Sequence, residues 1–189
     1  MVIMSILKSR ICYNFSGDIM KLADLKCVNE EVNLKEYTTL RELVKKNMEH
    51  PEWLGDFSEE DLISLLNNGS KIWLYYHGDE AVCSMMLIPA TEKSLKKFNL
   101  DLDYKQVADY GPSFVKPKFV GNGLQYQMLN VLNNYSLTSG YKYAVGTIHP
   151  DNIYSINNVL KDGFVLKGYK EFKRGPRNIY LKDLERDDK

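Results

Sequence analysis

The stretch VKPKFVGNGLQYQML, residues 115–129, decides the fold. It follows an apolar run, contains the breaker Pro117, and places Gly121 and Gly123 directly before an amphipathic helical pattern. The first N–H groups of a helix have no partner within the helix, and the helix dipole adds about half a positive charge at that end. Because glycine has no Cβ atom, an anion can approach its backbone closely. The stretch therefore predicts a strand, an anion-binding turn and a helix in succession.

Two common phosphate-binding motifs do not fit this stretch. A P-loop requires Gly-Lys-Ser/Thr, whereas this sequence has Gly123, Leu124 and Gln125. A dinucleotide-binding fold requires a third glycine and an acidic residue about twenty positions further on, within repeated strand–helix units. Taken alone, the turn fits an ordinary helix start with glycine as well as it fits an anion site.

The rest of the chain predicts a mixed sheet with helices, an α+β fold. Residues 90–105 form an insertion with room for a short helix, Gly111-Pro112 predicts a kink in its strand, and the last hairpin is expected to turn around Gly175-Pro176. We expect strands over residues 25–32, 71–77, 80–88, 107–115, 141–148, 164–173 and 178–184, and helices over 34–49, 58–67, 121–139 and 152–161.

Length and composition bound the class of protein. The 189 residues fit one domain, which we place at residues 21–189, with residues 1–20 as an N-terminal arm or extra strand. Lys plus Arg and Asp plus Glu both total 25, and this zero net charge argues against nucleic-acid binding despite the basic hairpin at residues 170–177. No stretch is long and apolar enough to predict a membrane span. The three cysteines have no metal-ligand spacing, which predicts no metal site and buried, reduced thiols in a cytoplasmic protein. A homodimer remains open.

Two motifs in one frame resemble a known family. Val115-x-Pro117, followed by residues 120–125, resembles the acetyl-CoA motif of the GNAT superfamily of acetyltransferases. Asn152-x-x-Ser155, followed by Gly163-Phe164, resembles the second signature of that family at the expected distance. The resemblance implies the acyl-CoA N-acyltransferase fold: a mixed, mostly antiparallel central sheet with a splayed pair of central strands, and helices on both faces.

The resemblance also implies a function. Acetyl-CoA would be the cosubstrate, and an amine of a small molecule, peptide or protein would take the acetyl group by direct attack in a ternary complex. Backbone groups of Phe114 and Val115 would pair with the pantetheine arm, and Asn152 and Ser155 would line the splayed edge beside it. The pyrophosphate would lie on the turn and the first amides of the helix, which comprise Val120, Gly121, Asn122, Gly123, Leu124 and Gln125.

The sequence departs from the family pattern at three positions. Val120 stands where the family has Gln or Arg, Gln125 where it has a small residue, and Val159 where many members have the tyrosine that protonates the leaving thiolate. The side chain of Gln125 must therefore point away from the phosphates or contact them itself. These departures keep a second hypothesis open, a non-catalytic acyl-CoA-binding or sensor domain with a degenerate site. Lys116, Lys118 and Lys161 fit either contacts to the outer phosphate or solvated surface positions.

Two residues are candidates for the catalytic base. Asp109 lies on the strand before the kink, where family members often place a carboxylate, although it also fits an exposed strand position. His149 ends the buried strand and has a reference pKa suited to proton removal, although it also fits a cap of the Pro150-Asp151 turn.

For the acceptor, the loop of residues 50–57 combines two aromatics with Glu52 and Asp56. That combination suits a cationic amine. The alternative is that Trp53 and Phe57 only pin two helices together.

Overall fold

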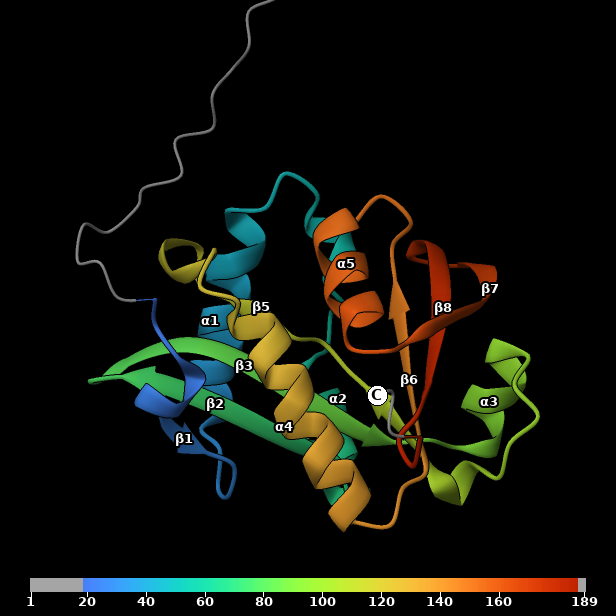
Figure 1. Ribbon diagram of the computed structural model, residues 1–189. Helices are drawn as coiled ribbons and strands as arrows, with labels where there is room; N and C mark the ends of the chain where they lie inside the picture. The colour runs from blue at the N-terminus through green and yellow to red at the C-terminus, as the bar shows by residue number, and fades with distance from the viewer. Residues whose placement is uncertain (1–18, 187–189) are drawn as a thin grey trace, which may run out of the picture.

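The computed structural model describes residues 19–186 (Figure 1). Nearly all of the predicted arm, residues 1–20, thus lies outside the described residues. Within them, an eight-stranded sheet has the order β1-β2-β3-β4-β6-β8-β7, and β5 pairs with β3 beside this path. The strands are β1 (Lys26–Val28), β2 (Lys71–His77), β3 (Glu80–Pro89), β4 (Val107–Tyr110), β5 (Phe114–Val115), β6 (Tyr143–Ile148), β7 (Val165–Phe172) and β8 (Gly175–Asp183). All neighbours are antiparallel except β4 and β6, which are parallel.

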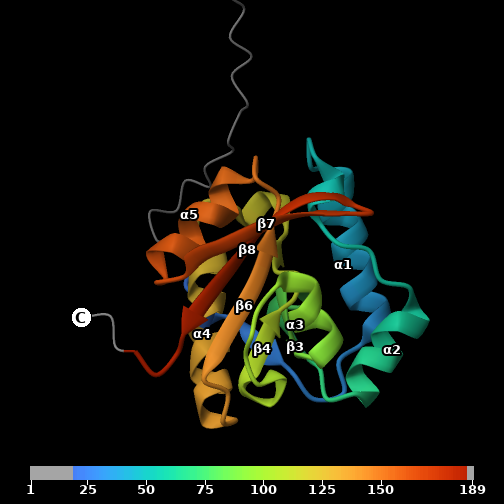
Figure 2. The same ribbon diagram turned by 90° about the vertical axis from the view of Figure 1, so that its right-hand side faces the viewer.

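The helices cover both faces of this sheet, as predicted. They are α1 (Leu34–Lys46), α2 (Glu59–Asn67), α3 (Glu92–Phe98), α4 (Leu124–Thr138) and α5 (Ile153–Lys161). Helices α4 and α5 lie on one face, and α1 and α2 lie on the other (Figure 2). Helix α3 is the short helix expected within residues 90–105.

Strand β3 contributes side chains to a hydrophobic core on each face of the sheet. Successive side chains of a strand point to opposite faces, so Met85 and Met86 enter different clusters, both without solvent exposure. Met85 packs in the cluster that includes Met128 of α4. Met86 packs in the cluster that includes Tyr37 of α1 and Leu62 of α2. The sheet is therefore anchored on both faces, and a site at its end is held rigidly.

The two central strands, β4 and β6, diverge part-way along their length. Strand β4 pairs with β6 from Val107 to Asp109, where Asp109 faces Val145. The chain then kinks at Gly111-Pro112, as predicted, and continues as β5, which pairs with β3. A Cβ at Gly111 would lie 3.2 Å from the Cβ of Met86, so only glycine fits this approach without displacing the neighbour. The splayed pair of central strands is confirmed.

Three expectations differ from the structure. The last hairpin turns at residues 173–174, because Gly175 takes a φ of +92° and already pairs with Phe172, which places Gly175 and Pro176 in β8. Strand β1 spans only Lys26–Val28, at the edge of the sheet. On that edge strand Cys27 is exposed, whereas Cys83 is buried as expected, and Cys12 lies outside the described residues. None of the described helices is long and apolar enough to cross a bilayer.

Candidate functional site

The turn before α4 leaves the start of that helix open. Gly121 and Gly123 have φ angles of +96° and +68°, in the left-handed region that favours glycine. A Cβ on either residue would meet no heavy atom within 4 Å, so the space beside the turn is empty of protein. Asn33, Ser58 and Thr91 cap α1, α2 and α3 with their side chains, whereas Gly123 gives α4 no such cap. The first N–H groups of α4 are therefore free of a side-chain acceptor at an accessible helix start.

Side chains brace this turn from behind. The Asn122 amide accepts a hydrogen bond from the Met20 N–H (3.1 Å) and donates one to the Phe119 carbonyl (3.0 Å). Gln127 donates to the Asn122 carbonyl (3.2 Å) and accepts from the Leu22 N–H (2.8 Å). The side chain of Asn122 is thus engaged within the protein, and the part of the turn that remains for a ligand is backbone.

Gln125 joins the first turns of α4 and α5. Its amide donates to the Ser155 hydroxyl (3.1 Å) and accepts from the Asn158 amide (2.8 Å). Asn152 caps α5 by accepting from the Ser155 N–H (3.1 Å). The sequence allowed the side chain of Gln125 either to contact the phosphates or to point away from them. In the structure it is directed to α5. The structure therefore brings Gln125, Asn152 and Ser155 together at the start of α5 and gives each of them a positioning contact.

The splay supplies a backbone edge beside the turn. Strand β5 pairs with β3 on one side, and the second half of β6 pairs with β8 on its far side. Past Asp109 and Val145, the edges of β5 and β6 that face each other have no strand between them in the described chain. An extended ligand could pair with such an edge as an added strand.

The three lysines proposed for the outer phosphate are engaged elsewhere. Lys116 and Lys118 both form ion pairs with Glu80 on β3, and Lys161 lies 4.3 Å above the ring of Tyr126. Val120, where the family has a polar side chain, is 63% exposed. The side chains around the turn therefore leave the binding of an anion mainly to its backbone.

Asp109 occupies the point at which β4 and β6 diverge. It is the last residue of β4 that pairs with β6, and its side chain shares a sheet face with those of Val145 and Thr147. Burial raises its pKa to about 7, although the positive charge of Arg174 opposes this shift. The alternative of an exposed strand residue does not hold, because Asp109 is partly buried. It is a carboxyl group that changes its charge near neutral pH.

His149 takes the capping role that was its alternative interpretation. Its Nδ1 accepts a hydrogen bond from the Asp151 N–H (3.2 Å), within the Pro150-Asp151 turn. Its ring stacks on Trp53 at 5.5 Å, and Trp53 stacks in turn on His50 at 4.5 Å. One ring nitrogen and one ring face of His149 are therefore occupied by structural contacts.

A cavity of about 460 Å³ lies between the α1–α2 loop and the tip of the β7–β8 hairpin. It is lined by Glu52, Leu54, Gly55, Asp56, Lys173 and Arg174. The sequence predicts the loop as part of an acceptor site, but it does not predict the two cations of the hairpin tip, Lys173 and Arg174. Trp53 and Phe57 do not line the cavity, since Trp53 stacks between histidines and Phe57 packs on the α1 core. Phe57 thus packs against both helices, as its alternative interpretation supposed, whereas Trp53 joins the loop to His149 at the end of β6.

Solved structures with the same architecture come from acetyltransferases. The chain superimposes on an N-acetyltransferase from Staphylococcus aureus with a TM-score of 0.64 and 15% identity, over 85% of this chain and 99% of that one. A protein assigned to the GNAT family from Desulfovibrio desulfuricans superimposes with a TM-score of 0.59 and 14% identity, over 85% of this chain and 99% of that one. The aminoglycoside acetyltransferase AAC(6')-Ib, solved with paromomycin and acetyl-CoA, superimposes with a TM-score of 0.65 and 15% identity, over 87% of this chain and 98% of that one. This chain has the GNAT fold.

No model of a protein family and no curated protein sequence matches the chain, so the fold, not the sequence, carries the likeness to GNAT proteins. Within that fold Val159, at the position of the family tyrosine, is 9% exposed and packs in the core cluster beneath α4. Among residues 19–186, no group of three His, Cys, Asp or Glu side chains is placed to hold a metal ion. The groups that this domain offers for chemistry are therefore backbone amides, Asp109 and the charged wall of the cavity.

Proposed function

We propose that this chain transfers an acetyl group from acetyl-CoA to an amine. One observation carries the proposal: an uncapped helix start, opened by Gly121 and Gly123, follows directly on β5, whose free edge faces the gap between the splayed strands. An anion site and a strand-like slot in that order suit a ligand with a diphosphate followed by an extended amide-containing arm. Coenzyme A has this chemistry.

Binding would rest on the backbone. The N–H groups of residues 121–125 would donate to the pyrophosphate at the positive end of the α4 dipole. The amides of the pantetheine arm would pair with Phe114 and Val115 as an added strand between β5 and β6. AAC(6')-Ib was solved with acetyl-CoA and an acetyltransferase from Bacillus subtilis with CoA, which supports the assignment by analogy of fold.

Asp109 is the residue that we assign as general base. An amine with a reference pKa of about 10 is protonated at neutral pH and must lose its proton before it can attack. A carboxyl group with a pKa near 7 can accept that proton, directly or through a water molecule. The amine nitrogen then bonds to the thioester carbonyl carbon, and a backbone N–H at the Phe114–Val115 end stabilises the oxyanion. When the C–S bond breaks, the thiolate of CoA leaves with the electron pair, and the nitrogen loses its second proton to water to give the neutral amide.

The leaving group needs no side-chain acid in this scheme. Val159 has no hydroxyl group and is buried, so it cannot protonate the thiolate. A free thiol has a reference pKa of about 8.5, which makes the thiolate a sufficiently good leaving group to take its proton from water.

Val159 and the exposed Val120 also favour the second hypothesis, a domain that binds acyl-CoA without transferring the acyl group. Both lack a polar group that the family motif supplies, one at the thiolate and one at the phosphates. The two functions share the binding site and differ in turnover, so one experiment separates them.

The test combines CoA binding with thiol release. Titration calorimetry of the full chain with CoA should give saturable binding at one site. Release of free thiol from acetyl-CoA should then depend on an added amine from a panel of amino acids, polyamines, peptides and aminoglycosides. Binding without thiol release on any acceptor would favour the sensor, and the absence of CoA binding would refute both hypotheses.

A further inference from the structure

We propose that the cavity between the α1–α2 loop and the β7–β8 hairpin takes an amine acceptor that also carries an anionic group, a carboxylate or a phosphate, bound by Arg174. The inference rests on the proposed acyl transfer and specifies its substrate class. It reverses the expectation of a purely cationic acceptor that the acidic loop suggested.

The acidic residues of the cavity are already paired. Asp56 forms an ion pair with Lys45 of α1, and Glu52 pairs with Nδ1 of His50 at 3.1 Å. Both carboxylate side chains are more than half exposed, so water also screens them. Asp56 therefore offers little uncompensated negative charge, and Glu52, whose partner His50 is charged only when protonated, is one carboxylate beside the two cations Lys173 and Arg174.

The cations of the cavity wall have no such partners. Within the described part of the chain, neither Lys173 nor Arg174 has a carboxylate within 4.0 Å, and the guanidinium of Arg174 reaches only the Thr147 hydroxyl, at 3.4 Å. Behind them Arg177 is 1% exposed and donates only to the carbonyls of Pro176 (2.6 Å) and Glu52 (2.8 Å). A buried cation held by neutral carbonyls keeps its positive charge on this wall, which therefore attracts an anion.

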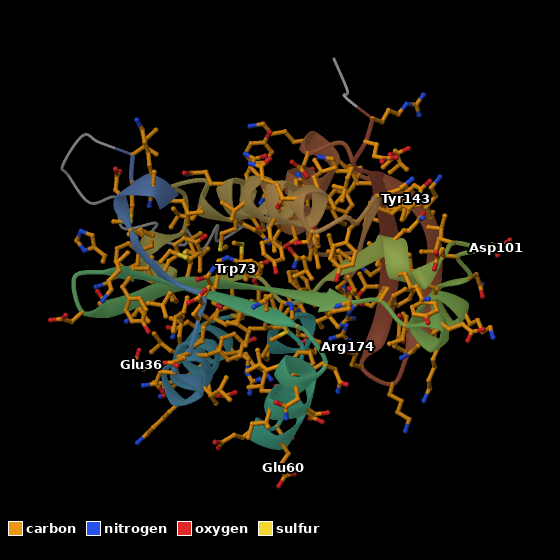
Figure 3. The ribbon with its side chains drawn as sticks, turned by 90° about the horizontal axis from the view of Figure 1, so that it is seen from below. Glu36, Glu60, Trp73, Asp101, Tyr143 and Arg174 are labelled. Atoms are coloured by element: carbon orange, nitrogen blue, oxygen red, sulfur yellow. The ribbon has the colours of Figure 1, made fainter. Side chains whose placement is uncertain are left out.

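The absence of a side chain at Gly55 leaves room for the Arg174 guanidinium beside the loop. A Cβ on residue 55 would lie 2.5 Å from Nη1 of Arg174, which is closer than any real contact, so a side chain there would displace the guanidinium. Figure 3 shows Arg174 on the side of the sheet that carries α1 and α2, opposite α4. Arg174 is exposed at the mouth of the cavity, where its planar fork can bind a carboxylate or phosphate through two parallel hydrogen bonds.

The same cation connects the cavity to Asp109. The charge of Arg174 acts on the Asp109 carboxyl, and its contact with Thr147 places it over the splayed end of β6. An acceptor whose anionic group lies on Arg174 would therefore bring its amine towards Asp109 within the length of one small molecule.

The experiment uses matched pairs of acceptors that differ only in the anionic group. The probes are β-alanine against β-alaninamide for the carboxylate, and O-phosphoethanolamine against ethanolamine for the phosphate. We expect kcat/KM for the anionic member of at least one pair to exceed that of its neutral partner by about 10-fold to 100-fold. The pair that shows the preference identifies the anionic group.

Variants assign the preference to Arg174. Arg174→Gln should remove it, and Arg174→Lys should restore part of it. Lys167→Gln, which removes an exposed cation from β7 away from the cavity, should leave the preference unchanged. Equal rates for both members of each pair, or a preference that survives Arg174→Gln, would overturn the proposal.

A binding measurement separates this proposal from the proposed function. With saturating CoA in place of acetyl-CoA, the same probes should raise the Tm of the wild-type chain more when they are anionic, and Arg174→Gln should abolish the difference. Such a shift without any thiol release would support the anion site and contradict acyl transfer. Thiol release without selectivity, or CoA binding with no response to any probe, would contradict the anion site.

Discussion

The two sides of the sheet present their candidate sites with different parts of the chain. On the α4 side the site is backbone: two glycines open the helix start, and the side chains of Asn122, Gln125 and Gln127 are turned away to hold it. On the α1–α2 side the cavity is walled by charged side chains from a loop and a hairpin tip. The backbone site should thus respond to changes of conformation, and the cavity to changes of charge.

Asp109 lies where these two sides meet, and Asp109→Asn should have the largest effect. Removal of the proposed general base should lower kcat/KM by about 10²-fold to 10⁴-fold while CoA binding is kept. In the wild type, kcat/KM should rise with pH through an apparent pKa near 7, as the carboxyl group ionises. A pH–rate profile of both proteins tests this. A full loss of activity in His149→Ala, with activity kept in Asp109→Asn, would move the base to His149.

The Asp109→Asn variant should lose activity but gain stability at alkaline pH. The raised pKa means that the unfolded chain ionises from about pH 4 upwards, whereas the folded chain keeps the proton until about pH 7. Ionisation of Asp109 therefore lowers the free energy of unfolding of the wild type across that range, and the full loss remains above pH 7. The variant should be more stable than the wild type at pH 8, by about 1 kcal/mol or more, with little difference at pH 4. Chemical denaturation at both pH values measures it.

The next largest effect should follow from Gly123→Val. A β-branched residue at φ +68° forces the turn to change its conformation, and the N–H groups lose their common direction. CoA affinity should fall by about 10-fold to 100-fold, as expected for the loss of one or two hydrogen bonds to a charged group. Gly140→Val is the matched control, because Gly140 has φ +87° at the other end of α4. Calorimetry should show an equal loss of stability for both variants, of about 1–2 kcal/mol, but weak CoA binding only for Gly123→Val.

Gln125→Ala should have a smaller effect. It removes both hydrogen bonds that join α4 to α5, which should lower the free energy of unfolding by about 1–2 kcal/mol. CoA affinity should fall only about threefold, since the backbone amides of the site remain. Asn134→Ala, an exposed position on the same helix, serves as the control and should change neither quantity. An unchanged denaturation midpoint for Gln125→Ala would show that the bridge does not position the site.

The smallest effect is expected for Gly55→Ala. The added methyl group displaces the Arg174 guanidinium without removing its charge. The preference for anionic acceptors should therefore fall by about twofold to fivefold, which is the range for an exposed ion pair, and the neutral acceptors should react as before. Gly168→Ala, where a Cβ meets nothing within 4 Å, is the matched control on β7. An unchanged preference in Gly55→Ala would show that the position of the guanidinium is not set by the loop.

The same contrast explains what could be predicted from the sequence. The glycine turn, the helix after it and the kink at Gly111-Pro112 depend on neighbouring residues, so local rules predicted them. The charge of the cavity could not be predicted, because Gly55 and Arg174 lie about 120 positions apart and meet only in the folded chain. The expected turn around Gly175-Pro176 already placed Arg174 between the two strands, but nothing in the neighbouring residues shows that its side chain meets the loop at Gly55.

The contacts of Met20 and Leu22 with the turn before α4 have a consequence for the order of folding. They join residues 102 and 105 positions apart, so a long loop of chain must close before either hydrogen bond can form. Contacts of such high sequence separation form slowly, whereas the helical turns of α4 are local. Pulse-labelling hydrogen exchange during refolding should therefore find the N–H groups of Met20 and Leu22 protected later than those in the body of α4. A chain shortened to begin at Leu25 should show the same early events without that last step.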